Sequence, residues 1–81
     1  MLSIKVLGPG CARCVEVAQL AQRAVNTLSV DARVEKVTDI SEIAKFRILV
    51  TPGLVINDKV VCAGRIPTVP EVTTWVANAL G

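Results

Sequence analysis

The chain has 81 residues, 52% of them hydrophobic and only 2% aromatic, and a formal net charge of +2. This length leaves room for one compact domain, so we expect residues 1–81 to form a single domain. The Lys and Arg residues are scattered, and almost no aromatic side chains are present to stack on bases, which argues against a nucleic-acid partner. No apolar stretch approaches the ~20 residues that cross a bilayer, and the first residues do not resemble a signal peptide. We therefore expect a cytoplasmic protein without a membrane partner.

The N-terminal part of the chain predicts a strand, a helix and a second strand. Leu2–Leu7 is a short apolar-rich run typical of a strand, and Gly8-Pro9-Gly10 ends it with a turn. From Cys11 to about Leu28, apolar residues recur at three- and four-residue spacing, which predicts a helix with one buried face. Asp31–Val37 alternates and predicts a strand parallel to the first, joined by a right-handed crossover. The apolar helix positions are Val15, Ala18, Ala21, Val25 and Leu28.

Two further helices begin at capping-box patterns. Asp39 is expected to cap a short helix that continues to about Phe46, with Glu42 reaching back to the free amides. Thr68 and Glu71 repeat the pattern at the start of a last helix, with a proline in its first turn. The apolar face of the last helix comprises Val72, Val76, Ala79 and Leu80.

A hairpin lies between these helices. Thr51-Pro52-Gly53 interrupts the chain, and the β-rich runs Leu54–Ile56 and Val60–Cys62 follow it. The turn-forming Asn57-Asp58-Lys59 separates the two runs, which predicts an antiparallel hairpin. The whole order is β-α-β-α-β-β-α. It predicts an α/β fold with a central four-stranded mixed sheet and helices on both faces.

A pair of cysteines, Cys11 and Cys14, lies between the first predicted strand and the first predicted helix, at the start of the helix. Cysteines three apart at a helix start come close enough to bond, with the first exposed and the second turned inward. The free amides and the positive end of the helix dipole stabilise a thiolate there, and the pKa of such thiols falls from ~8.5 to roughly 3.5–7.5. Arg13 adds a positive charge that acts in the same direction. We expect the Cys11 thiolate to attack a substrate disulfide and Cys14 then to attack Cys11, which releases the reduced product.

Other interpretations of the pair remain open. Two cysteines at this spacing also supply half of a tetrahedral zinc site, so a metal- or metalloid-binding thiol protein, such as a zinc or copper carrier, is the alternative. The chain has no histidine, and Cys62 is its only other thiol, so a four-thiolate site would need a second chain. The cysteines could also simply pack in a core, or the fold could serve as a binding module with redox chemistry secondary.

The Thr51-Pro52 dipeptide gains meaning from its position. It precedes the third predicted strand, whose start is expected beside the end of the first strand and therefore beside Cys11. A proline at such a site can hold a cis bond. It also leaves neighbouring backbone groups available to an extended substrate segment, as in strand addition.

These features together resemble the thioredoxin/glutaredoxin superfamily, and more narrowly the small redox-active disulfide proteins. The resemblance implies a thioredoxin-like fold, a thiol–disulfide oxidoreductase acting as a protein disulfide reductase, and no cofactor or resident metal. It implies Cys11 as nucleophile, Cys14 as resolving cysteine and Pro52 as the cis-proline facing them. The matching segments are Gly8-Pro9-Gly10-Cys11-Ala12-Arg13-Cys14, then Thr51-Pro52-Gly53 with the hairpin to Val61, then Ala63-Gly64-Arg65-Ile66-Pro67.

The resemblance also sets expectations for neighbouring residues and partners. Thr51, Arg13, Gly10 and Ala12 are expected to support substrate binding around the pair. Disulfide-containing proteins and an unidentified reductase are the expected partners, and a monomer is the expected state. The sequence departs from ordinary thioredoxins in having Gly10, not tryptophan, before the pair and no acidic residue in the first strand.

Three further residues have structural interpretations. Cys62 is expected to be a small buried apolar residue, as free cysteines usually are. Arg65 is expected to be solvated at the end of a strand. Trp75 is expected to pack, fully or partly buried, on the last helix.

Overall fold

The computed structural model of the protein describes residues 2–10, 12–48 and 50–80. The elements follow the predicted order, so the α/β fold class with a four-stranded mixed sheet is confirmed. In chain order they are β1 (Leu2–Leu7), α1 (Ala12–Leu28), β2 (Ala32–Val37), α2 (Ile40–Ala44), β3 (Gly53–Ile56), β4 (Lys59–Ala63) and α3 (Val69–Leu80).

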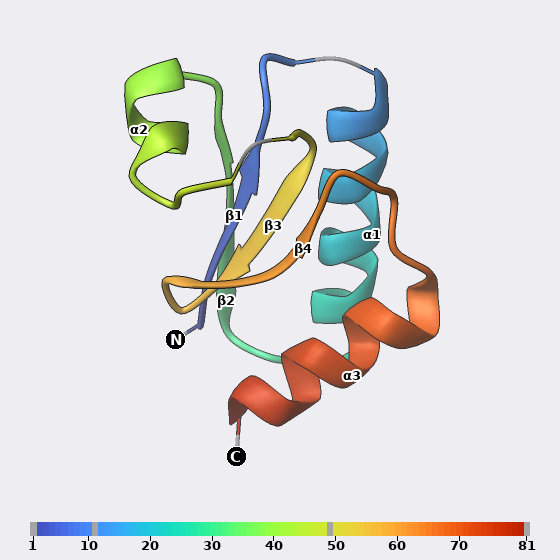
Figure 1. The fold of residues 1–81 in the computed structure, drawn as a ribbon. Coiled ribbons are helices and arrows are strands. Elements are labelled where there is room, and N and C mark those ends of the chain that lie inside the picture. Colours follow the sequence, from blue (N-terminus) through green and yellow to red (C-terminus); the bar gives the residue numbers. More distant parts are fainter. Residues whose placement is uncertain (1, 11, 49, 81) are drawn as a thin grey trace.

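The four strands form one sheet in the order β2-β1-β3-β4. β1 and β2 are parallel, whereas β1–β3 and β3–β4 are antiparallel. Helices α1 and α3 lie side by side on one face of the sheet, and α2 lies on the other (Figure 1). The loop after β1 and the start of β3 meet at the same end of the sheet as the start of α1 (Figure 1). This arrangement is the thioredoxin-like fold.

The two faces of the central strands are filled by aliphatic side chains. Ile4, Val6 and Leu54 point toward α1 and α3, and each is at most 1% exposed. The intervening residues Leu7 and Val55 point to the opposite face, where they pack with Ile43 of α2. This alternation follows from the two-residue period of a strand. Because both faces are covered, β1 and β3 form the buried centre of the sheet.

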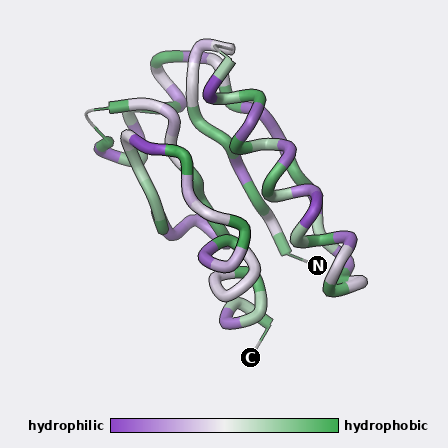
Figure 2. The backbone as a smooth tube through the Cα atoms, turned by 90° about the vertical axis from the view of Figure 1, so that its right-hand side faces the viewer, coloured by the Kyte–Doolittle hydropathy of each residue, from purple (hydrophilic) through white to green (hydrophobic). Residues whose placement is uncertain are grey.

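The helices bury one face each, as the spacing of their apolar residues predicts. Figure 2 shows hydrophobic and hydrophilic residues interspersed along the chain rather than gathered in one long run. In α1, Val17 and Ala24 are buried in addition to the predicted Ala18, Ala21 and Val25. The prediction for Leu80 is wrong, because this side chain, in the last turn of α3, is 55% exposed. None of the helices in the described ranges is long and apolar enough to cross a membrane.

Local turns refine the predicted boundaries. The second helix ends at Ala44 instead of Phe46, and Arg47 adopts the left-handed conformation with φ of 57°. Asp39 caps this helix, since its carboxylate accepts a hydrogen bond from Ser41 N at 2.8 Å. The prediction that Glu42 reaches back to the free amides is wrong, because its carboxylate accepts from Lys45 Nζ at 3.0 Å and pairs forward along the chain.

The hairpin turn is one residue shorter than predicted, because Lys59 already belongs to β4. Asn57 and Asp58 both have positive φ, 50° and 66°. Positive φ at both central residues is the geometry of a two-residue hairpin turn whose twist matches that of the strands. Asn57 also ties the turn to β1, because its side-chain oxygen accepts from Ser3 N at 3.0 Å.

Candidate active site

The candidate site lies where β1 passes into α1. Gly8-Pro9-Gly10 ends the strand, and Gly10 has a φ of 91°, a conformation that side chains rarely adopt. Cys11 lies outside the described residues; in the sequence it directly precedes α1. Ala12 and Arg13 are exposed in the first turn of α1, whereas Cys14 is buried, with 5% of its surface exposed. Cys14 is therefore held inward by the same turn that leaves its predecessors in solvent.

Gly8 is the residue that makes room for Cys14. A Cβ atom added at Gly8 would overlap the Cys14 Sγ atom and lie 3.3 Å from the Cys14 Cβ. The same point lies 3.8 Å from the Thr51 Cβ. The end of β1 thus brings Cys14 and Thr51 to one place, although 37 positions separate them in the sequence.

The Thr51–Pro52 peptide bond is cis. Pro52 is buried and Thr51 is exposed, so the dipeptide has one side in the core and one in solvent. The Pro52 carbonyl oxygen accepts a hydrogen bond from Gly64 N at 2.8 Å. Gly64 has a φ of 82° and immediately follows β4, so the end of the hairpin holds the start of β3 in place.

Comparisons with known proteins place this geometry in a family. A family model for the thioredoxin domain matches residues 2–77. The chain belongs to the thioredoxin family. A thioredoxin of Methanocaldococcus jannaschii is 40% identical over 72 residues, which cover 89% of this chain and 83% of that protein. A thioredoxin of Methanothermobacter thermautotrophicus is 31% identical over 72 residues, covering 89% and 94%. The protein is thus a thioredoxin-family redox protein.

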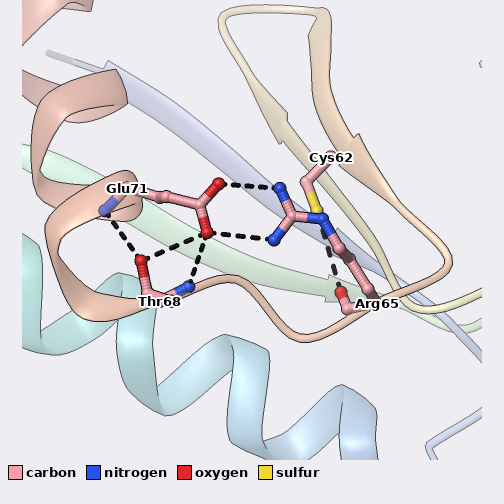
Figure 3. A network of polar contacts seen from close by, with 4 residues as sticks. All are labelled: Cys62, Arg65, Thr68 and Glu71. Atoms are coloured by element: carbon pink, nitrogen blue, oxygen red, sulfur yellow. Dashed lines mark hydrogen bonds and ion pairs between the residues drawn. The ribbon is translucent and has the colours of Figure 1, made fainter.

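In this thioredoxin-family chain, a network of polar contacts fixes the loop between β4 and α3 (Figure 3). Arg65 donates two hydrogen bonds to the Glu71 carboxylate, from Nη1 at 3.0 Å and from Nη2 at 2.7 Å. Glu71 also accepts from Thr68 N at 3.0 Å, and Glu71 N donates to Thr68 Oγ1 at 3.3 Å. The predicted capping box is therefore confirmed. Arg65 is exposed just after β4, as predicted, and the Glu71 carboxylate on the next helix also binds it in bidentate fashion.

Charge pairing changes the acidity of Glu71. The hydrogen bonds from Arg65, and then that from Thr68 N, lower the pKa of Glu71 from 4.5 to about 2. Both charged forms are stabilised, since the same pairing raises the pKa of Arg65. The carboxylate consequently stays ionised throughout the physiological range and continues to anchor the loop that begins at Gly64.

Cys62 is buried beside this network, as predicted. Its Sγ lies 3.7 Å from the Arg65 carbonyl oxygen, to which it donates (Figure 3). Burial raises the pKa of the Cys62 thiol; Arg65 acts against this change and Glu71 adds to it. A buried thiol of raised pKa is a poor nucleophile. In the described parts of the chain, no group of three or more Cys, Asp or Glu side chains is placed to hold a metal ion.

An apolar hollow of about 260 Å³ lies next to the thioredoxin-family site. It is lined by Pro9 from the turn after β1, by Thr51 before the cis-proline, and by four aliphatic side chains. Ile40 and Val50 are 80% and 54% exposed, an unusual extent for aliphatic residues. The four aliphatic residues are Ile40, Ile43, Ile48 and Val50.

Sequence reasoning missed several of these contributions. The hollow is not predicted from the sequence. A signal for it exists, because Ile40 and Val50 are aliphatic residues in segments where polar residues are expected, and such residues indicate an exposed apolar patch. The close contact of Gly8 with Cys14 was not anticipated either, because a glycine in a turn motif suggests backbone conformation rather than lack of space.

Proposed function

We propose that this protein reduces disulfides in protein partners by dithiol exchange through Cys11 and Cys14. The observation that supports this most strongly is the position of Cys14, buried at the first turn of α1 against Gly8 and next to Thr51. Cys14 follows Cys11 by three residues, and its thiol is shielded from solvent. Such a thiol suits a resolving cysteine, because it has to react only after Cys11 has formed a mixed disulfide with the partner. The reducing cytoplasm would keep the pair in its dithiol form.

In the proposed reaction the Cys11 thiolate attacks one sulfur of the partner's disulfide. A Cys11–partner disulfide forms, and the partner's other sulfur leaves as a thiolate. Cys14 then loses its proton and attacks the Cys11 sulfur. An internal Cys11–Cys14 disulfide forms and the second partner thiolate leaves, so two electrons have moved to the partner. An unidentified reductase then supplies two further electrons, and with two protons from solvent the Cys11–Cys14 disulfide becomes the dithiol again.

The residues around the pair have distinct proposed roles. Arg13 supplies a positive charge next to the reacting thiol, and the dipole of α1 adds to it. Ala12 and Gly10 are small and exposed, so they leave the approach to the pair open. Thr51 is exposed directly before the buried Pro52, and its proposed role is to pair through its backbone with an extended segment of the partner.

The apolar hollow beside Thr51 is proposed to accept an aliphatic or aromatic side chain of that segment. Ile40 and Val50 are exposed aliphatic side chains. When a partner covers such side chains, the complex is stabilised by about 25 cal/mol for each Å² of apolar surface buried. A partner bound both by its backbone and by one apolar side chain would present its disulfide in a defined orientation. This supports proteins, in preference to small disulfides, as substrates.

A redox titration tests the proposal. The protein is equilibrated at graded potentials, free thiols are alkylated, and the modified residues are located by mass spectrometry. We expect one two-electron transition confined to Cys11 and Cys14, near the roughly −270 mV of thioredoxins. If no Cys11–Cys14 disulfide forms, or if the thiols resist alkylation until a chelator is added, the alternative function of a metal-binding thiol protein replaces this one.

A trapping variant tests the division of labour. Cys14→Ser should accumulate a stable mixed disulfide between Cys11 and an oxidised protein substrate such as reducible insulin, because no resolving thiol remains. Cys62→Ser is the matched control, since it removes a buried thiol outside the pair and should trap nothing. Equal turnover by Cys14→Ser and the unaltered protein would exclude Cys14 as the resolving cysteine.

A further inference from the structure

The two edges of the sheet differ in regularity. Along β4, a register shift between Leu54 and Val55 leaves Val61 as an extra residue, which is a bulge. Bulges disrupt the outer edge of a strand and discourage pairing with another chain. Along β2, by contrast, six residues pair with β1 in unbroken parallel register, from Leu2–Ala32 to Leu7–Val37. β2 therefore presents a regular edge about 20 Å long.

The backbone of β2 divides its hydrogen-bonding groups between β1 and the exterior. The carbonyl oxygens of Asp31 and Val37 accept from Leu2 N and Gly8 N, each at 2.9 Å. Successive residues of a strand turn their backbone groups to opposite sides, so the odd-numbered residues of β2 serve β1. The even-numbered residues Ala32, Val34 and Lys36 turn theirs outward. β2 packs mainly against β1 and α1, and no proline interrupts it.

The side chains of β2 are arranged to complement a second copy of themselves. Arg33 and Glu35 lie on the same face, where Arg33 Nε and Glu35 Oε1 form an exposed ion pair at 3.7 Å within the chain, with side chains 70% and 45% exposed. In an antiparallel pair centred on Val34, Arg33 of each copy lies opposite Glu35 of the other. The outward-facing residues then form the hydrogen-bonded pairs, and Arg33 with Glu35 forms the closer, non-hydrogen-bonded pairs.

Neighbouring registers are disfavoured by charge. If the antiparallel pairing were centred on Arg33, the Arg33 side chains of the two copies would lie opposite each other. If it were centred on Glu35, the two Glu35 side chains would lie opposite each other. Like charges directly opposite each other destabilise a strand pair, whereas unlike charges stabilise it. The sequence of β2 thus selects one register. On the other face, the two Val34 side chains meet beside a shallow hollow of about 270 Å³ that Val15 and Ala18 of α1 help to line.

We propose that two copies of this chain associate through their β2 edges, antiparallel and centred on Val34, to form a continuous eight-stranded sheet. This differs from the monomer expected from the sequence. The association does not cover Cys14 or Thr51, because β2 is the outermost strand and these two residues lie beside Gly8, at the end of β1. It does not depend on the proposed redox function.

Sedimentation of the full chain in the presence of a thiol reductant tests the proposal. The unaltered protein should sediment as a concentration-dependent dimer, and the dissociation constant should rise with salt. Arg33→Glu alone, or Glu35→Arg alone, should raise the dissociation constant about tenfold or more, because each opposes like charges at two symmetric positions. The double variant Arg33→Glu/Glu35→Arg should restore the dimer, since the unlike pairs are re-formed in exchanged positions.

Two outcomes would overturn the proposal. One is a monomer at every concentration up to the millimolar range. The other is a dimer that the single charge reversals leave unchanged or that the double variant fails to restore. Arg47→Glu, an exposed charge reversal after α2, is the control for an effect of net charge alone and should leave the dimer unaffected.

Discussion

Gly8 packs directly against Cys14, so that even a methyl group at position 8 would overlap the cysteine sulfur. Gly8 is the first residue after β1, and Cys14 lies in the first turn of α1. The distance between strand and helix at this point is consequently set by the absence of a side chain. Any residue larger than glycine must move either the helix or the thiol.

Gly8→Ala tests this contact. We expect the free energy of unfolding in urea to fall by about 1–3 kcal/mol, the usual cost of overpacking a buried position. We also expect slower decay of the mixed disulfide formed by Cys11, because the resolving thiol is displaced. Gly10→Ala is the comparison: among the described residues, apart from the chain neighbours, no atom lies within 4 Å of its added methyl group, and its φ of 91° is unfavourable for a side chain. It should therefore lose stability without slowing resolution, and equal resolution rates in the two variants would contradict the role given to Gly8.

Ile40→Asp tests the apolar hollow as the contact for protein substrates. Ile40 is 80% exposed, so the change should leave stability within about 0.5 kcal/mol. Turnover of a protein disulfide should fall several-fold, because a charge now lines an apolar surface, while turnover of a small aromatic disulfide should not. Leu80→Asp is the matched control, an exposed leucine at the far end of α3. A similar loss in both variants would indicate a nonspecific effect.

The acid stability of the protein should depend on Glu71. Its pKa is about 2 in the folded protein and 4.5 without its partners, so the folded state binds fewer protons between these values. The stabilisation is therefore complete above about pH 4.5 and is lost as the pH falls toward 2. Glu71→Gln should flatten the dependence of unfolding free energy on pH across this window, as measured by urea denaturation. Arg65→Gln should flatten it in part, because it removes the larger cause of the shift; an unchanged slope in both would contradict the assignment.

The order of elements is predictable from the sequence because each element has its own local signal. Apolar spacing identifies α1, Asp39 caps α2, the Thr68–Glu71 capping box begins α3, and Asn57-Asp58 marks the hairpin. These signals act over a few residues, and the structure agrees with them to within one or two positions. Two predicted apolar helix positions, Val15 and Leu80, lie outside the buried core, because periodicity identifies a helix face and does not report which part of that face its neighbours cover.

The site is less predictable because its contacts join distant residues. Nothing local to Gly64 indicates that its N–H binds the Pro52 carbonyl oxygen, and nothing local to Arg65 indicates its pairing with Glu71. Such contacts depend on how the hairpin and α3 are placed in space. The position of Cys14 near Thr51 was predictable only through the strand order that the motifs implied.

The final prediction concerns the charge next to the reacting cysteine. Arg13 is exposed in the first turn of α1, so Arg13→Gln should leave the fold intact. Arg13 follows Cys11 by two residues in the sequence, and removal of one positive charge near a thiolate reduces its stabilisation by roughly 0.5–1 kcal/mol in a solvent-exposed setting. The rate of Cys11 alkylation by iodoacetamide at neutral pH should then fall about two- to fivefold, and the difference should shrink at high salt. Two variants are the controls: Arg23→Gln, farther along the same helix, should leave the alkylation rate unchanged, and Arg13→Lys, which keeps the charge, should preserve it. Equal alkylation rates for Arg13→Gln and Arg23→Gln would show that the charge of Arg13 does not activate the thiol.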